Sequence, residues 1–518
     1  MSGGEHLEVA AAIGRRLVRD ALWSGRCCTW FGWDWQMRGA QLQPVYRTTS
    51  PALGNGTAGI GLFLAELGVA TGDPFIAQAA RGALAHAAAR IGAWPAEGAA
   101  GLWTGLAGAA VAFRLAGAVL ADEEWHRAAA SALDALEARR PDAARAAVYD
   151  GEAGAIVAFL DAGRPGPALA RAEALARAAR REDGRAFWPS AEAEAGLVGY
   201  ACGTAGIALA LLDLHAATGE AGPRDLALEA LAHEDAQIDP ALGLWPDLRI
   251  ASGPVAPAAA AARWPIAWLH GTAGGVPARL RLGALLPDRA GPDLGPGLLA
   301  IAASLDPMQA LQRDFSVATG IAGNAGALML AARMLGRPDL ADPARRAAAD
   351  GIARFAAPRM PWPCSGPPDC ERPDLLFGLA GIGRFYLGLH EGTGLRDLLL
   401  FVPQAGVADA AARAEAPPPE PPAPADRAEA EAKDTGRGKD KAKAEDTAKA
   451  GDEAKPESKA KPDDRDRPED KAEAEDTGDR SRPDPRAGRR RRRTDLPPEP
   501  PRPRTPSGAK RPRRKPSP

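Results

Sequence analysis

Cysteine is scarce in this sequence. The 518 residues include five cysteines: Cys27 and Cys28 are adjacent, Cys202 is isolated, and Cys364 and Cys370 are six residues apart. This odd, low number excludes a scaffold held together by disulfides, and it favours a cytoplasmic protein with free thiols.

The sequence also lacks a secretion signal and a clear membrane span. Glu5, Glu8, Arg15 and Arg16 interrupt the N-terminal region, so no apolar signal core precedes a cleavage site. One of the longest uncharged stretches, 195–212, has 18 residues, but it contains four glycines and polar residues, and similar segments recur along the chain. We therefore expect a buried core helix there and no membrane span.

Large apolar residues are nearly missing from the C-terminal part of the chain. Residues 1–405 are rich in Ala, Leu, Gly and Trp, whereas 406–518 consist mainly of Pro, Ala and charged residues. Such a composition cannot offset the entropy lost on ordering, so we expect a disordered tail. Its five-arginine run, Arg489–Arg493, could bind an acidic partner, although a solvated tail is the simpler interpretation.

What the sequence does contain is an internal repeat. A Gly-x-Ala-Gly tetrad opens an apolar run seven times. The tetrads begin at Gly56, Gly105, Gly151, Gly203, Gly271, Gly320 and Gly378. The segment after each tetrad is apolar nearly all round, which predicts a buried helix. Segments between tetrads, such as 122–139 and 167–181, have one apolar stripe and predict outer helices. The pattern indicates an all-α closed ring with strands nearly absent.

The glycines have a physical reason in this interpretation. Glycine at a helix entry lets backbones approach closely, and the following Ala keeps the helix end narrow. The exposed amides would leave seven positive helix ends facing one pocket. Such a pocket would suit a thiolate, a carboxylate or an enolate.

The tetrads, with the segment GRCCTWFG (Gly25–Gly32) ahead of them, resemble the lanthionine synthetase C-like (LanC) family. The resemblance extends from Glu5 to about Phe401. It implies an α,α-toroid of seven inner and seven outer helices within residues 1–405, followed by the tail at 406–518. It also implies the family's chemistry, in which a peptide's cysteine thiol adds to dehydrated Ser or Thr. A zinc ion held by two Cys and one His binds that thiol as thiolate.

The family's zinc positions carry no suitable ligands in this chain. The two Cys positions correspond to Leu269 and Ala318, and the His position corresponds to Thr319. Leucine and alanine cannot bind a metal, and threonine is a poor zinc ligand. Although the family would imply zinc, we therefore expect no cofactor.

Other functional positions of the family also differ. Cys202 stands where the family has a His before the fourth tetrad. Ala147 stands where it has an Asp, while Asp150 directly precedes the third tetrad. An Arg of the family falls on Pro265, with Arg263 nearby.

Cys202 and His270 precede consecutive tetrads and are the candidate catalytic pair. A Cys beside a His can form a thiolate–imidazolium pair, although a buried Cys and an inherited His are the simpler interpretation. The residues expected around the pocket as peptide contacts are Trp268, Asp150, Thr319 and Tyr200. For Thr319, helix capping together with Asp314 is the alternative.

Two further sites remain open. A relocated metal site could combine Cys202 and His270 with Cys364 and Cys370, although their spacing is not that of a zinc knuckle. The Trp-rich segment that follows Cys28 either packs on the toroid or forms a peptide-binding surface.

Two functions agree with these observations, and a third would need residues that the sequence lacks. The first is a LanC-like protein that modifies a precursor peptide, either cyclising it without zinc or assisting a dehydratase or kinase-like partner enzyme. The second is a non-catalytic scaffold that holds a peptide or partner, so whether the chain is an enzyme stays open. A carbohydrate-active or terpene-cyclising toroid would need paired acids or an Asp-rich motif at the inner helix ends, where the sequence has neither.

Overall fold

The computed structural model describes residues 3–38, 41–142, 144–249, 263–310, 314–367, 370–392 and 396–403. The predicted tail, with Arg489–Arg493 and the boundary near residue 405, lies outside the described residues. Within those ranges, no helix is long and apolar enough to cross a membrane. The uncharged stretch 195–212 is a loop that continues into a buried helix beginning at Thr204.

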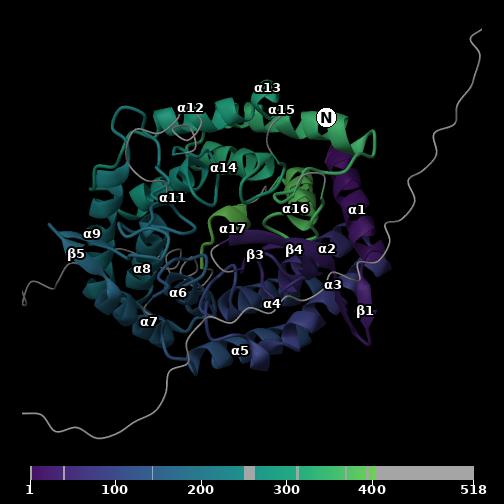
Figure 1. Cartoon of the computed structure of the whole chain (residues 1–518), viewed down its shortest axis with the longest axis horizontal. Coiled ribbons are helices and arrows are strands. Elements are labelled where there is room, and N and C mark those ends of the chain that lie inside the picture. Colours follow the sequence, from purple (N-terminus) through teal and green to yellow (C-terminus); the bar gives the residue numbers. More distant parts are fainter. Residues whose placement is uncertain are drawn as a thin grey trace, which may run out of the picture. The chain divides into compact units, whose positions relative to one another are not determined.

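Seven buried helices form the inner layer of a ring. Each begins at the second residue of a tetrad, and the first glycine is its N-cap. They are α2 (Thr57–Thr71), α4 (Leu106–Leu120), α6 (Glu152–Asp161), α8 (Thr204–Thr218), α11 (Thr272–Leu285), α14 (Ile321–Met334) and α16 (Leu379–Glu391). Each helix contacts the next, and α16 contacts α2, so the ring closes (Figure 1).

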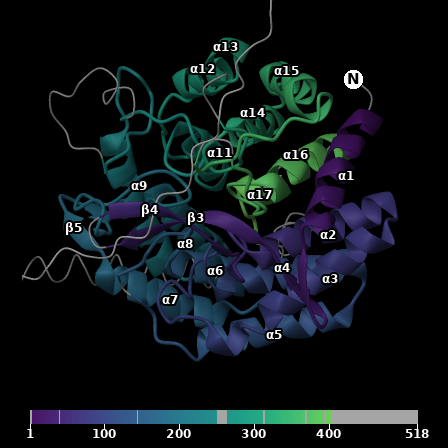
Figure 2. The same cartoon turned by 45° about the vertical axis from the view of Figure 1, so that its right-hand side comes forward.

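Among the described residues, seven outer helices cover the inner layer. They are α3 (Pro74–Ala88), α5 (Glu123–Glu137), α7 (Pro165–Ala178), α9 (Ala221–Gln237), α12 (Gly295–Ser304), α15 (Asp342–Gly351) and α1 (Gly3–Arg19). The first six pack on the inner helix that precedes them, whereas α1 packs on α16, the last one (Figure 2). The predicted α,α-toroid of seven inner and seven outer helices is confirmed. Shorter helices are η1 (Ile91–Ala93), α13 (Pro307–Ala310), η2 (Pro338–Ala341) and the π-helical η3 (Ile352–Ala356).

In the part of the chain that the structure describes, three antiparallel hairpins accompany the helices, and the sequence pattern did not predict these hairpins. They are β1 (Leu22–Ser24) with β2 (Cys27–Thr29), β3 (Phe31–Arg38) with β4 (Gln41–Thr48), and β5 (Arg180–Glu182) with β6 (Arg185–Phe187). Asp183 and Gly184 connect the last pair, and both have positive φ, 51° and 74°. An Asp-Gly pair favours this type of two-residue turn, so the signal was present in the sequence.

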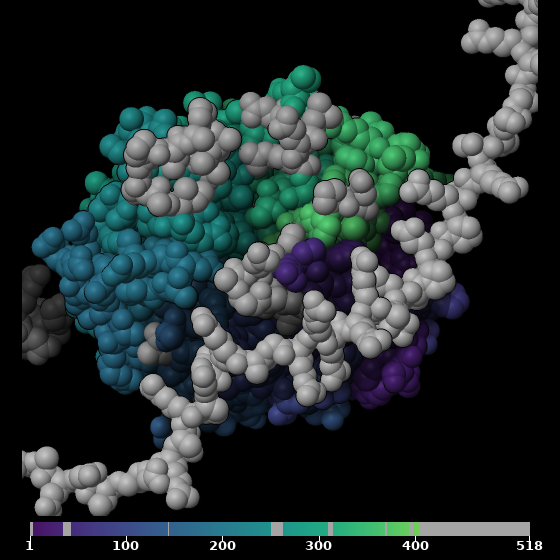
Figure 3. Space-filling model, in the orientation of Figure 1, coloured from purple at the N-terminus to yellow at the C-terminus, as the bar shows by residue number. Residues whose placement is uncertain are grey.

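In and beside the Trp-rich segment, some aromatic side chains are buried and others are exposed. Trp30 is 1% exposed, and its indole nitrogen donates to the Leu17 carbonyl at 2.8 Å, so it packs on the toroid. Phe31 and Tyr46 on the β3–β4 hairpin are 48% and 60% exposed, and their rings stack. Figure 3 shows atoms of the N-terminal part of the chain, in purple, at the surface of the face in view. The side chain of Trp35 lies outside the described residues.

The last described segment lies inside the ring. Helix α17 (Arg396–Leu399) contacts α14, and both views place it within the circle of inner helices (Figures 1 and 2). The Trp268 indole nitrogen donates to the Leu399 carbonyl at 2.8 Å, and the Phe401 amide donates to the Tyr200 hydroxyl at 3.0 Å. This segment therefore packs against the loops that precede α8 and α11.

Candidate functional site

The loop before each inner helix folds back onto the tetrad. In all seven repeats the amide of the second tetrad residue donates to the carbonyl seven residues upstream, as Thr204 does to Leu197 at 3.0 Å. The last glycine of each tetrad lies against a second loop carbonyl. A Cβ on Gly206 would lie 1.9 Å from the Tyr200 oxygen. Only glycine permits this close approach without moving the loop.

These hydrogen bonds change the expected electrostatics of the helix ends. The first amide of every inner helix is already bonded to its own loop. An amide with a carbonyl partner is no longer free to bind an anion. The prediction that seven free helix ends face one pocket is therefore wrong for these amides.

A second set of backbone hydrogen bonds joins the repeats to one another. It uses the residues two positions before each tetrad, which are Gly54, Trp103, Tyr149, Ala201, Leu269, Ala318 and Leu376. At six of the seven junctions the amide of one donates to the carbonyl of the next, as from Tyr149 to Ala201 at 2.8 Å. Among the described residues, only the bond from Ala201 to Leu269 is not formed. The backbone ring is interrupted between repeats four and five.

A cavity of about 640 Å³ lies beside this interruption. Asp150, Cys202 and His270 line it, and they are the residues that directly precede the third, fourth and fifth tetrads. Other polar residues of the lining are Glu97, Asp142, Arg145, Tyr149, Trp188, Ser190, Glu192, Thr204 and Arg249. The fold thus brings together three of the predicted site residues in a space that can hold a ligand.

Burial keeps Cys202 and His270 uncharged. Desolvation raises the pKa of Cys202 well above its ordinary value, and the nearby charge of Asp150 adds to this effect. Desolvation, together with the positive charge of Arg249, lowers the pKa of His270 to about 4. The two side chains therefore rest as a thiol and a neutral imidazole, and this state does not favour a thiolate–imidazolium pair.

Two arginines of the lining are held by carboxylates. Arg145 Nη1 lies 2.6 Å from Asp150 Oδ2, and Arg145 also pairs with Glu97. Arg249 donates to both oxygens of Asp247, at 2.9 and 2.7 Å. The bidentate pair fixes the Arg249 guanidinium and the two separate carboxylates fix that of Arg145, so both arginines are positioned before any ligand binds.

Sequence reasoning missed both arginines. Arg145 has a recognisable place, because its carbonyl accepts from the Glu152 amide at the offset shared by all repeats. Arg249 has no such offset to the fifth tetrad. It reaches the cavity because the Asp247 amide donates to the Arg263 carbonyl at 2.7 Å, a contact between loop segments.

Trp268 and Tyr200 are not part of the cavity lining. They are 1% and 3% exposed, and their polar atoms are bonded to Leu399 and Phe401. Burial raises the pKa of Tyr200 to about 12. In this structure the two residues hold the C-terminal segment inside the ring, and a contact of either with a peptide stays a prediction.

Thr319 stabilises its own loop. Its hydroxyl donates to Asp314 Oδ2 at 2.9 Å, and Asp314 Oδ1 accepts from the Ser316 amide at 2.8 Å. Thr319 is also absent from the lining of the cavity. The capping interpretation of Thr319 and Asp314 is wrong, because the N-cap of α14 is Gly320 and no side chain caps that helix; the two side chains bond within the preceding loop instead.

The residues at the family's zinc positions do not fit a zinc ion. Leu269 and Ala318 have hydrocarbon side chains, and the Thr319 hydroxyl is already bonded to Asp314. Zinc in proteins requires Cys, His or carboxylate ligands.

The alternative metal site is not assembled either. Within the described part of the chain, no group of three or more His, Cys, Asp and Glu side chains could hold a metal ion. Cys364 is buried, its Sγ lies 4.0 Å from the Arg372 carbonyl, and burial raises its pKa to about 12.

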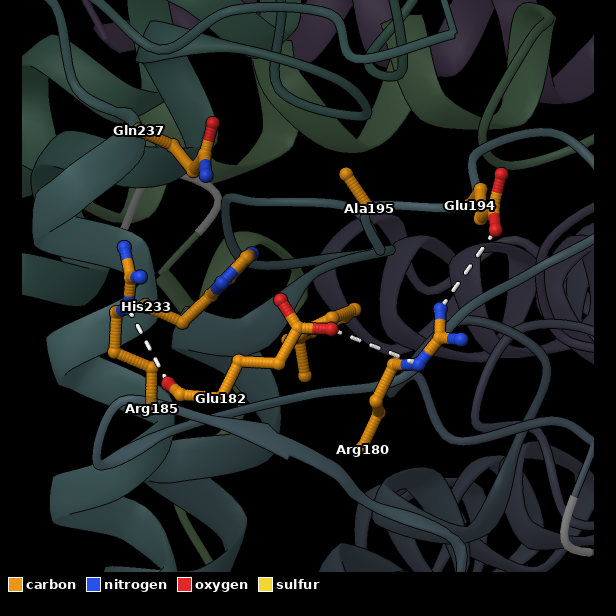
Figure 4. Close-up of a pocket in the computed structure, with 8 residues that line it drawn as sticks. Arg180, Glu182, Arg185, Glu194, Ala195, His233 and Gln237 are labelled. Carbon is orange, nitrogen blue, oxygen red and sulfur yellow. Dashed lines mark hydrogen bonds and ion pairs between the residues drawn. The ribbon is translucent and has the colours of Figure 1, made fainter.

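A smaller cavity of about 330 Å³ lies between the β5–β6 hairpin and α9 (Figure 4). His233 stacks on Phe187 with ring centroids 4.8 Å apart, and burial lowers the pKa of His233 to about 4. Arg180 pairs with Glu182 and Glu194. None of the predicted site residues lines this cavity, so the larger one is the candidate site.

The family model described as lanthionine synthetase C-like protein matches residues 47–400. The chain belongs to the LanC-like family. No curated protein sequence matches it. Among solved structures, nisin cyclase is similar at 14% sequence identity and a TM-score of 0.49, covering 68% of this chain and 92% of that one.

Membership of the LanC-like family confirms the resemblance inferred from the tetrads. In this LanC-like chain the loop contacts that require the tetrad glycines are present in every repeat. The side chains at the family's zinc positions, which precede the fifth and sixth tetrads, are not zinc ligands in this chain. The cavity lies at the neighbouring junction, between repeats four and five.

Proposed function

We propose that this LanC-like chain adds a peptide's cysteine thiol to a dehydrated Ser or Thr without using zinc. The observation that carries the proposal is the 640 Å³ cavity lined by Asp150, Cys202 and His270. Family membership supports a modified precursor peptide as the substrate class. A cavity of this size can take the reacting side chains of such a peptide.

The reaction requires one proton to move. A C–S bond forms as the C=C π bond of the dehydrated residue breaks, and the thiol proton must reach the α carbon. Neutral His270 accepts the proton from the peptide's thiol and returns it to the α carbon. No co-reactant is consumed.

The low basicity of His270 decides the order of events. Moving a proton from an ordinary thiol, with a pKa of about 8.5, to His270, with a pKa of about 4, is uphill by roughly 6 kcal/mol. Proton transfer therefore accompanies C–S bond formation instead of preceding it. Arg249, whose positive charge lowers the pKa of His270, would stabilise the negative charge that develops on the enolate.

Cyclisation of a dehydrated peptide tests the proposal. Free thiols are alkylated at successive times and counted by mass spectrometry, because cyclisation itself leaves the mass unchanged. We expect the protein to remove free thiols faster than the peptide does alone, and a chelator to leave this rate unchanged. His270→Ala should slow the reaction about 100-fold or more, since it removes the proton carrier. His215→Ala, on α8 but outside the cavity lining, is the matched control.

Equal thiol loss with and without the protein would refute the catalytic proposal. One equivalent of zinc in the purified protein, with activity lost on chelation, would refute its zinc-free form.

The resting state of Cys202 favours a second candidate, a scaffold that binds a modified peptide or a dehydratase or kinase-like partner enzyme without catalysis. A neutral thiol is a weak nucleophile, so its presence in the cavity fits binding better than covalent chemistry. Fluorescence anisotropy with labelled dehydrated peptide distinguishes the two. Binding that leaves the cyclisation rate unchanged would favour the scaffold.

A further inference from the structure

A concavity of about 550 Å³ beside the outer helix α1 is lined by four arginines. Its lining residues are Ala12, Arg15, Arg16, Arg19, Arg359 and Pro361. No carboxylate belongs to this lining as the structure describes it, and none of these residues lines the candidate active site. The concavity is therefore a separate, strongly basic surface.

The four guanidinium groups differ in their partners. Arg16 Nη1 donates to Glu371 Oε1 at 2.7 Å, and Arg19 Nε donates to Asp20 Oδ1 at 2.7 Å. For the described residues, no ion pair involves Arg15 or Arg359. Within the described part of the chain, two positive charges at the same concavity thus have no ion-pair partner.

The backbone at Arg359 points to a role for its side chain. Its φ is 58°, in the left-handed region, and its amide donates to the Ala356 carbonyl at 3.2 Å. The next amide, of Met360, reaches back to the Phe355 carbonyl at 2.9 Å. A helix end of this kind favours glycine, because a Cβ is strained there. Arginine places a guanidinium at the concavity in spite of this conformation.

We propose that this concavity docks an acidic segment of a polypeptide. Arg15 and Arg19 are four residues apart on α1, roughly 6 Å along the helix axis, and Arg359 comes from a different element. Such a spread suits a row of anionic groups better than one compact anion. The planar guanidinium fork matches the carboxylates of acidic side chains, as it also matches phosphate, so the spread of the arginines is what favours an acidic segment. The proposal concerns a surface outside the candidate active site and does not depend on the chemistry there.

Fluorescence anisotropy with a labelled oligoglutamate peptide and the full-length protein tests this proposal. We expect binding that weakens as salt is added, because exposed ion pairs are screened. Arg15→Gln and Arg359→Gln should each weaken the affinity about two- to fivefold. Arg127→Gln on α5 removes an exposed arginine outside the concavity and should leave the affinity unchanged.

The variant Arg359→Gly separates binding from folding. Glycine relieves the left-handed backbone, so the melting temperature should rise or stay the same while peptide affinity falls. Unchanged affinity in Arg359→Gly and Arg15→Gln would overturn the proposal, as would equally tight binding of an oligoglutamine peptide. Displacement of oligoglutamate by inorganic phosphate, but not by sodium chloride of equal ionic strength, would also overturn it in favour of a phosphate site.

Discussion

The Tyr200 carbonyl oxygen lies where a side chain on Gly206 would begin, and the equivalent contact recurs in the other six repeats. Backbone atoms, which every residue type has, therefore decide what this position can hold. The chemistry of the pocket does not restrict which residue this position can hold. The tetrads can therefore be retained although Leu269, Ala318 and Thr319 stand at the zinc positions. The glycines are required by the close packing of the loop and not by metal binding.

Gly206→Ala should destabilise the protein by about 2–4 kcal/mol, because the new Cβ forces the loop away from α8. Gly283→Ala on α11 is the matched control, since no atom lies within 4 Å of its Cβ position. There alanine should stabilise the helix by about 0.5–1 kcal/mol. Urea unfolding measures both, and a Gly206→Ala midpoint equal to that of the native protein would contradict the argument.

At the scale of elements, a buried side chain joins the segments around repeats four and five. Glu234 on α9 is 0% exposed. It accepts from the Gly199 amide at 3.0 Å, the Ala205 amide at 3.1 Å and the Trp245 indole nitrogen at 2.6 Å, and also from the Thr204 hydroxyl. The Trp245 ring packs in turn against α11 at Gly275. Glu234 thus connects elements on both sides of the interrupted backbone ring.

Glu234→Gln should lower the free energy of unfolding by about 2–4 kcal/mol. An amide has one oxygen to accept with, so donors that the carboxylate satisfied are left buried without a partner. Glu220→Gln, at an exposed N-cap position without a side-chain capping bond, should change it little. Chemical denaturation of both variants is the measurement, and equal losses would argue against a connecting role for Glu234.

At the scale of the whole molecule, buried ionisable groups oppose one another as pH changes. Burial lowers the pKa of His233 and His270 to about 4, so each stabilises the fold above pH 6.5 and loses that effect as pH falls towards 4. Burial raises the pKa of Asp213, which pairs with Arg281, to about 6. Asp213 therefore favours the fold at low pH, and this contribution is lost as pH rises through 6.

His270→Gln should flatten the fall in unfolding free energy between pH 6.5 and pH 4.5, removing a contribution of roughly 3 kcal/mol at most. Asp213→Asn should make the same fall steeper, since it removes the group that acts in the opposite direction. Urea unfolding at a series of pH values measures the slopes. Parallel curves for the native protein and both variants would show that these groups do not control the pH dependence.

Part of the candidate site was predictable, because some of its residues have a fixed place in the repeat. Asp150, Cys202 and His270 directly precede tetrads, and the sequence alone places them on neighbouring loops. Arg249 has no such place, since it arrives through a contact between loop segments. Trp268 and Tyr200 occupy promising positions, but the C-terminal segment takes up their polar groups.

The amino-acid sequence by itself determined the ring of inner helices, their starting residues and the side chains at the zinc positions. These features depend on local signals, the tetrad and the apolar run after it, that repeat along the chain. Only the tertiary structure decided that α1 covers α16, that α17 lies inside the ring, and that Cys202 and His270 rest uncharged. The physical reason is that burial and charge at these places come from residues far away in the chain, whose proximity exists only once the ring has closed.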